Sequence, residues 1–219
     1  MGQWIELDTA HGRIRAWRVA PDREARAAIV VVQEIFGVNA HIRSVAARYA
    51  QADYLAVAPA YFDVIEPNAE LGYDAAGIAR GRELVAALGL EKANELTAFT
   101  AQALGASAPV GTVGYCWGGT VALLAALRLG RPSVSYYGAR NLPFLEEPAE
   151  APVMFHFGAR DASIPPKMVA RHRSLMPQMR TYTYPAGHGF NCDVRDDYCP
   201  ASAELAWNRS LAFFDEHLR

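Results

Sequence analysis

The chain has 219 residues, of which 52% are hydrophobic, and a formal net charge of -2 from 21 Lys and Arg against 23 Asp and Glu. A chain of this length can bury a sizeable core, so we expect residues 1–219 to form a single domain. The sequence has no basic arm or run of cations, which excludes the usual nucleic-acid binders.

No apolar run approaches the roughly 18 residues of a membrane span. The N-terminal stretch "MGQWIELDTAHGRIRAW" alternates and carries charges, unlike a signal peptide. Glu6 stands where a myristoylation site needs serine or threonine. We therefore expect a cytoplasmic protein that binds neither a membrane nor nucleic acid.

Apolar runs typical of strands alternate with segments of helical periodicity. Strands are expected at 3–7, 13–19, 27–37, 55–62, 109–115, 132–138, 151–161 and 180–187. Helices are expected at 40–54, 73–104 with a break near 88–92, 117–130, 165–176 and 199–218. This alternation predicts an α/β fold with a mostly parallel sheet of about seven or eight strands and helices on both faces.

Polar residues follow four of the apolar strands: Glu34, Cys116, Asp161 and His188. Right-handed crossovers place the carboxyl ends of parallel strands along one edge of a sheet, and ligand sites of such sheets lie there. We therefore expect these four chemically capable side chains at the same edge.

The stretch Gly114-Tyr115-Cys116-Trp117-Gly118 fits the pattern G-x-S-x-G with cysteine in place of serine. That pattern is typical of a strained strand-to-helix turn that lifts a nucleophile clear of the sheet. The positive end of the following helix favours a thiolate, and the backbone N–H of Trp117 is a candidate oxyanion donor. Taken alone, the pattern also fits a buried structural cysteine at a glycine-rich packing site.

Asp161 in "GARD" and His188 in "PAGHGF" supply the order nucleophile, acid, histidine that hydrolases with this turn use. Histidine moves the proton between the thiol and the leaving group, and aspartate orients the imidazole. Singly, Asp161 also fits a helix N-cap and His188 a loop residue. The combination predicts a Cys116-His188-Asp161 triad.

Three cysteines argue against a disulfide framework. His188, Cys192 and Cys199 are close in sequence, but their spacing matches no common zinc pattern, so we expect neither a metal nor a cofactor. His156, inside an apolar strand, is expected in the core, and His41 is a candidate substrate contact. The other histidines, His11, His172 and His217, are expected at the surface.

The segments "QEIFGVNAHIR", "GYCWGG", "GARD" and "GHGF", in this order and over nearly the whole chain, resemble the dienelactone hydrolase family of α/β-hydrolases. In that family a glutamate holds the resting thiol, and an anionic substrate displaces the glutamate, which then takes the thiol proton. Glu34 matches that glutamate, and the second oxyanion donor would be the backbone N–H of Ile35.

Glu34 is also a candidate base from its position, because a carboxyl group at the end of an apolar strand is partly desolvated. The other interpretation is a salt-bridged loop carboxylate. Family members that hydrolyse dienelactone hold its carboxylate with two arginines. Arg80 or Arg82 fits the first, but Cys192 stands at the second position. Arg195, on the same loop, could replace that arginine, but the surrounding Asp193, Asp196 and Asp197 would repel an anionic substrate. The resemblance therefore does not imply that dienelactone is the substrate.

Together, these residues predict a cofactor-independent hydrolase that cleaves a small ester or lactone through a thioester at Cys116. The resemblance to the family implies that this substrate is an anion. Phe36, Trp117 and Tyr137 would line the substrate pocket. The alternative is a non-catalytic binding or thiol-sensing protein on the same fold, with Cys192 or Cys199 as the resolving thiol. We expect a monomer or a weak dimer.

Overall fold

The structure is a computed structural model that describes residues 2–105 and 108–219. The strands are β1 (Gln3–Thr9), β2 (Gly12–Val19), β3 (Ala27–Val32), β4 (Tyr54–Pro59), β5 (Val110–Tyr115), β6 (Ser133–Tyr136), β7 (Val153–Gly158) and β8 (Arg180–Tyr184). The helices are α1 (Ala40–Gln51), α2 (Ala75–Leu88), α3 (Leu90–Gly105), α4 (Trp117–Arg128), α5 (Pro166–Leu175) and α6 (Pro200–His217), with 3₁₀ turns η1 (Tyr61–Val64) and η2 (Leu142–Phe144).

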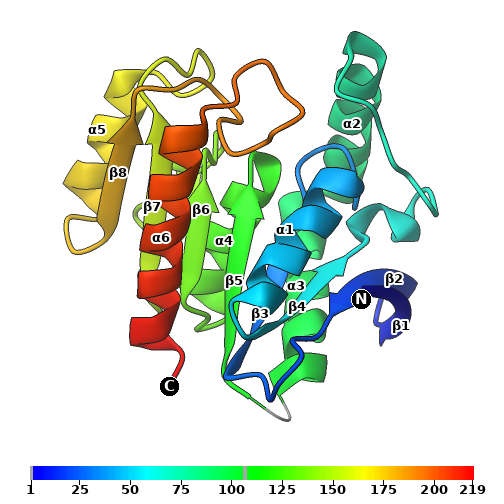
Figure 1. The fold of residues 1–219 in the computed structure, drawn as a ribbon. Coiled ribbons are helices and arrows are strands. Elements are labelled where there is room, and N and C mark those ends of the chain that lie inside the picture. The colour runs from blue at the N-terminus through cyan, green and yellow to red at the C-terminus, as the bar shows by residue number, and fades with distance from the viewer. Residues whose placement is uncertain (1, 106–107) are drawn as a thin grey trace. The chain divides into compact units, whose positions relative to one another are not determined.

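The strands of the described residues form one sheet in the order β1-β2-β4-β3-β5-β6-β7-β8 (Figure 1). The pairs β1–β2 and β2–β4 are antiparallel, and β3–β4, β6–β7 and β7–β8 are parallel. The predicted mostly parallel sheet with helices is confirmed. The chain divides into two compact units, one of residues up to Thr112 with Arg219 and one of Val113–Leu218.

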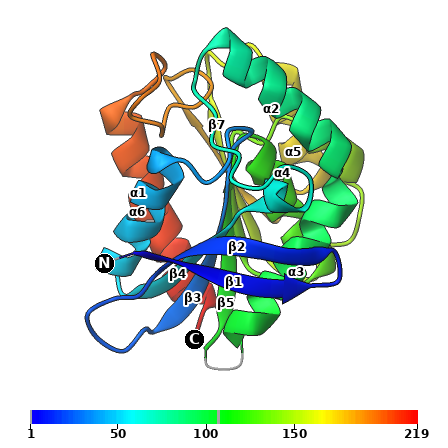
Figure 2. The same ribbon diagram turned by 90° about the vertical axis from the view of Figure 1, so that its right-hand side faces the viewer.

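In the first unit, α1 and α3 cover opposite faces of the strands (Figure 2). The helix α1 follows Asn39, whose side chain accepts a hydrogen bond from the Ile42 N–H at 3.2 Å. The helix α2 follows Asp74, which accepts from the Gly77 N–H at 2.7 Å. The helix expected from residue 73 therefore begins two residues later. The predicted break is confirmed at Gly89, whose φ of 74° ends α2.

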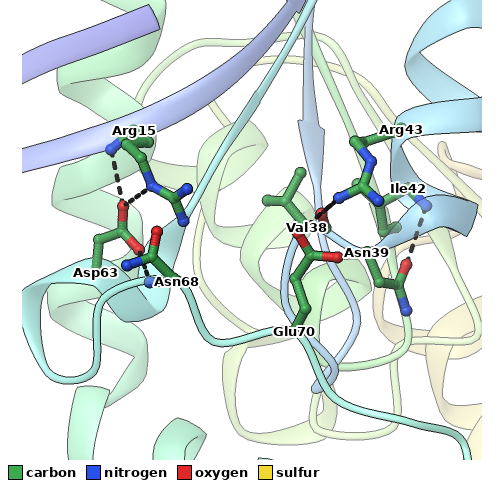
Figure 3. Close-up of polar contacts among 8 residues, drawn as sticks. All are labelled: Arg15, Val38, Asn39, Ile42, Arg43, Asp63, Asn68 and Glu70. Carbon is green, nitrogen blue, oxygen red and sulfur yellow. Dashed lines mark hydrogen bonds and ion pairs between the residues drawn. The ribbon is translucent and has the colours of Figure 1, made fainter. Parts of the chain in front are cut away.

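Five strands end earlier than the apolar runs suggested, and β3 and β4 show the reasons. The strand β3 ends at Val32, and the chain then turns through Gly37, where φ is 80° and a Cβ atom would lie 2.0 Å from the Ala69 carbonyl oxygen. The strand β4 ends at Pro59 because the next residues form η1. There Asp63 accepts hydrogen bonds from the Arg15 backbone N–H at 3.0 Å and the Asn68 N–H at 2.9 Å (Figure 3).

In the second unit, α4 and α5 lie on one face of the strands and α6 on the other (Figure 2). Eleven of the twelve residues of α4 are buried, so α4 is a core helix. This position explains why its sequence is apolar on every side. In the part of the chain that the structure describes, no helix has both the length and the apolar character needed to span a bilayer.

His156 on β7 is a core residue, as predicted, and burial together with the charge of Arg209 lowers its pKa to about 3. Its Nδ1 atom lies 2.8 Å from the Tyr184 hydroxyl and its Nε2 atom 3.2 Å from Ser210 Oγ. Ser210 donates its own hydrogen to the Ala206 carbonyl oxygen, so His156 Nε2 carries the proton and donates. This neutral ring satisfies its hydrogen bonds inside the core.

The expected surface position of His172 is wrong. His172 lies one turn after Val169 on the buried side of α5, and its ring packs on Phe155 and Phe157. Its Nδ1 atom lies 2.8 Å from the Met168 carbonyl oxygen, so this buried atom has a hydrogen-bond partner. Burial lowers the pKa of His172, which keeps the ring neutral.

Candidate active site

Cys116 occupies the sharp turn between β5 and α4. Its φ of 55° and ψ of −117° lie in a region that non-glycine residues rarely adopt, and such strain clusters at functional sites. Its N–H donates to the Tyr136 carbonyl oxygen at 3.0 Å, which fixes the turn against β6. A Cβ atom on Gly114 would lie 1.8 Å from the Gly118 carbonyl oxygen. The glycines of the sequence pattern therefore allow the helix to cross the strand closely.

The structure brings Cys116, His188 and Asp161 together. His188 Nε2 lies 3.2 Å from Cys116 Sγ, and His188 Nδ1 lies 2.7 Å from Asp161 Oδ2. The other carboxylate oxygen of Asp161 accepts from the backbone N–H groups of Ser163 at 2.8 Å and Ile164 at 3.2 Å. Asp161 thus caps the turn after β7 and holds the imidazole at the same time.

The proton affinity of His188 depends on these partners. Burial lowers the pKa of His188, but the hydrogen bonds with Asp161 and Cys116 and the charges of both partners raise it to about 10. When Cys116 is ionised, the ring is therefore an imidazolium at neutral pH. It suits donating a proton to a leaving group and stabilising an anionic sulfur, because it already carries both protons.

Trp117 and Tyr137, two of the expected pocket residues, lie beside these three residues. Trp117 directly follows Cys116 and is the first residue of α4, so its backbone N–H lies at the helix N-terminus. Tyr137 has no exposed surface and an unusual φ of 40°. Its ring centroid lies 5.2 Å from that of His188, so Tyr137 packs against the imidazole.

Glu34, Ile35 and Phe36 form the turn after β3 in the first unit. Glu34 has no exposed surface, and its Oε2 atom accepts a hydrogen bond from the Tyr73 hydroxyl at 2.9 Å. The Phe36 ring lies 4.4 Å from the Tyr73 ring. A Cβ atom on Gly81 would lie 2.3 Å from the Ile35 carbonyl oxygen, so α2 packs directly on this turn.

Arg80 and Arg82 are exposed on α2. Arg80 is paired with Glu83, at 2.6 Å, and with Glu66. Two carboxylates thus already neutralise the Arg80 guanidinium, which makes it a poor receptor for a substrate carboxylate. The sequence does not reveal this pairing, because Glu66 lies on a separate segment.

Cys199 lies before α6, and its sulfur is 3.1 Å from Ser202 Oγ. The hydrogen bonds from the Ser202 side chain and backbone lower the pKa of the Cys199 thiol. Cys192 is buried. The ring nitrogens of His188 contact Asp161 and Cys116.

Tyr73 and Asn39 contribute to the surroundings of Glu34 but were missed in the sequence. The Asn39 amide nitrogen donates to the Tyr73 hydroxyl at 3.1 Å. The sequence indicates only that Asn39 precedes a helix and can cap it, which does not predict a contact with Tyr73.

Comparison with known proteins matches this chain to one family. The model described as "Dienelactone hydrolase family" matches residues 14–218. A Synechocystis sp. protein named "Putative carboxymethylenebutenolidase" is 34% identical over 212 residues, covering 87% of this chain and 86% of that protein. A Bradyrhizobium sp. protein named "Probable 2-oxo-3-(5-oxofuran-2-ylidene)propanoate lactonase" is 31% identical over 238 residues, covering 98% and 94%. The crystal structure of "Putative Dienelactone Hydrolase" from Klebsiella pneumoniae has a TM-score of 0.88 and 27% identity, covering 99% of each chain.

Proposed function

Because this chain belongs to the dienelactone hydrolase family and is a carboxylic ester hydrolase, we propose that it cleaves a small ester or lactone through a Cys116-His188-Asp161 triad. The observation that carries this proposal is the pair of hydrogen bonds by which His188 links the Cys116 sulfur to the Asp161 carboxylate. A structural cysteine needs no such oriented pair.

In the proposed first half-reaction, the Cys116 sulfur attacks the carbonyl carbon and the carbonyl oxygen becomes an oxyanion. The backbone N–H groups of Trp117 and Ile35 are the proposed donors to that oxyanion. When the intermediate collapses, the bond to the leaving oxygen breaks, and His188 Nε2–H protonates it. The product is a thioester, with the alcohol still attached if the substrate was a lactone.

In the second half-reaction, His188 is neutral and accepts a proton from water as the water oxygen attacks the thioester carbon. Collapse expels the Cys116 sulfur as a thiolate and releases the carboxylic acid, which loses its proton to solvent. Protonated Glu34 then returns its proton to the sulfur, which restores the starting thiol. Asp161 stays ionised and steadies the imidazolium at both stages.

Glu34 is the proposed acceptor of the thiol proton at the start of the cycle. The resemblance of "QEIFG" to the family's glutamate segment supports Glu34 as this acceptor. In the family, binding of an anionic substrate triggers this transfer.

The proposed substrates are small esters and lactones, with no commitment to dienelactone itself. The names of the Synechocystis and Bradyrhizobium relatives, a carboxymethylenebutenolidase and a lactonase, support a lactone. Cys192 at the second family arginine and the pairing of Arg80 with Glu66 and Glu83 do not favour two-point binding of a carboxylate. A single domain and a monomeric or weakly dimeric state stay predictions.

The test is turnover of a panel that includes dienelactone, γ-butyrolactone and p-nitrophenyl acetate, by wild type and by Cys116→Ala. The proposal predicts turnover of at least one compound, lost in the variant and blocked by iodoacetamide. A thiol sensor would turn over none, and a different nucleophile would leave Cys116→Ala active.

A further inference from the structure

The hydroxyl of Tyr73 links two residues of the turn and helix that follow β3. It donates to Glu34 Oε2 at 2.9 Å and accepts from Asn39 Nδ2 at 3.1 Å. The orientation of the Asn39 amide is fixed, because its Oδ1 atom caps α1 by accepting from the Ile42 N–H (Figure 3). Since Asn39 must donate to the phenol oxygen, the proton of Tyr73 is directed to Glu34.

The 65–74 connection, which joins η1 to α2, is tied to the same turn at several points. The Leu71 N–H donates to the Phe36 carbonyl oxygen at 2.9 Å. Arg43 Nη1 donates to both the Val38 carbonyl oxygen and Glu70 Oε1, each at 2.7 Å (Figure 3). These contacts hold the backbone just before Tyr73, and Asp74, directly after it, caps α2. The position of Tyr73 therefore does not depend on its bond to Glu34.

Glu34 has no exposed surface, and burial disfavours the charged form of a carboxyl group. A carboxyl group can accept a proton only if it is ionised. A hydrogen bond donated to a carboxylate stabilises the ionised form, and bonds to charged groups are stronger than those between neutral groups. The phenol of Tyr73 is placed to compensate for the burial of Glu34.

We propose that Tyr73 is a positioning residue that keeps Glu34 ionised and correctly oriented to accept a proton. This inference rests on the role that the proposed function gives Glu34. Without the Tyr73 hydroxyl, Glu34 loses the hydrogen bond that stabilises a carboxylate and fixes its orientation. Loss of such a bond favours the protonated form of a carboxyl group, so the effect on turnover should be largest at low pH.

Other titratable groups near the turn are distinguishable from Glu34. A ring nitrogen of His41, on α1, lies within 4.8 Å of a Glu34 carboxylate oxygen. Arg43 and Glu70 neutralise one another, and Asp74 caps α2. The variant His41→Asn therefore separates an effect that acts through His41 from one that acts through Glu34.

The experiment measures kcat/KM for dienelactone, or for the best lactone of the panel, from about pH 5 to 9. Tyr73→Phe keeps the ring against Phe36 and removes only the hydroxyl. We expect the acid limb to move up by about one pH unit, a roughly tenfold loss at about pH 6, with recovery to within about twofold at pH 9. The matched control is Tyr61→Phe, which removes another buried hydroxyl of the first unit, bonded to Thr97, and should leave the profile unchanged.

Glu34→Gln and His41→Asn complete the set. Glu34→Gln should lower turnover and abolish the difference that Tyr73→Phe makes, and His41→Asn should leave that difference in place. A uniform loss across the pH range in Tyr73→Phe would show a merely structural role and overturn the inference. So would a shift that disappears with His41→Asn.

The inference and the proposed function fail in different ways. A Tyr73→Phe profile like that of wild type, beside an impaired Glu34→Gln, overturns the role of Tyr73 and leaves that of Glu34 standing. A Glu34→Gln enzyme as active as wild type overturns both roles, whereas the triad is judged separately by Cys116→Ala.

Discussion

Asp161 Oδ2 lies 2.7 Å from His188 Nδ1, and the side chain that carries it has no exposed surface. The second oxygen of this carboxylate is occupied by two backbone N–H groups. Asp161 therefore has one orientation, and it presents a fixed negative charge to one side of the imidazole. The other ring nitrogen faces the Cys116 sulfur at 3.2 Å.

The first prediction concerns these two partners. His188→Ala removes the proposed proton donor to the leaving group and should lower kcat/KM by about 10²–10⁴-fold, the usual range for general acid–base steps. Asp161→Asn should cost less, because the imidazole remains but is less well oriented. Asp22→Asn, at an exposed position, is the control and should change nothing. Wild-type rates in both His188→Ala and Asp161→Asn would leave Cys116 as a structural or redox thiol.

The second prediction concerns stability against pH. Burial lowers the pKa of His188, but its hydrogen bonds and the charges of its partners raise it from 6.5 to about 10. A raised pKa in the folded state means that the stabilisation is fully present below pH 6.5 and is lost as the pH rises through about 10. The difference in free energy of unfolding between wild type and His188→Gln should shrink over that window. Urea denaturation at a series of pH values measures it, and a constant difference would contradict the prediction.

The third prediction concerns the turn at Cys116. Gly114→Ala puts a Cβ atom 1.8 Å from a backbone oxygen, which no side-chain movement relieves. We expect a loss of about 3 kcal/mol or more in the free energy of unfolding, together with loss of activity. Gly105→Ala is the control, since the nearest atom there is 3.7 Å away. Equal stability of the two variants in urea would show that the close crossing of strand and helix is not required.

The fourth prediction concerns the other accessible thiol. Cys199 is partly exposed, and its hydrogen bonds with Ser202 lower the pKa of its thiol, so iodoacetamide should label it as well as Cys116. Cys199→Ser keeps a hydrogen-bonding atom beside Ser202 and should keep most of the activity. Peptide mapping after alkylation measures both sites. Activity lost in parallel with the labelling of Cys199 would contradict the assignment of Cys116 as the nucleophile.

The order of strands and helices was predictable because buried strands and amphipathic helices leave different periodicities. The proximity of Cys116, Asp161 and His188 was predictable because each follows a strand that ends at the same edge of a parallel sheet. The burial of His172 had a signal, since it lies three residues after Val169 on α5, but the ring's polarity suggested the surface.

The contact of Tyr73 with Glu34 was not predictable in this way. It joins residues 39 positions apart and depends on the path of the 65–74 connection, which has no periodicity. That path is fixed by single contacts, such as the one between Arg43 and Glu70. The pairing of Arg80 with Glu66 also depends on the path of this connection, which the sequence pattern does not predict.

A thioester at Cys116 can be detected directly by acid quenching of the enzyme during turnover of p-nitrophenyl acetate, followed by mass spectrometry of its peptides. The Cys199→Ser background removes the competing thiol. The account predicts an acetyl group on Cys116 that hydroxylamine removes, and its accumulation in His188→Ala, where deacylation lacks its base. Turnover with no acetyl group on Cys116, or with the acetyl group on another residue, would contradict it.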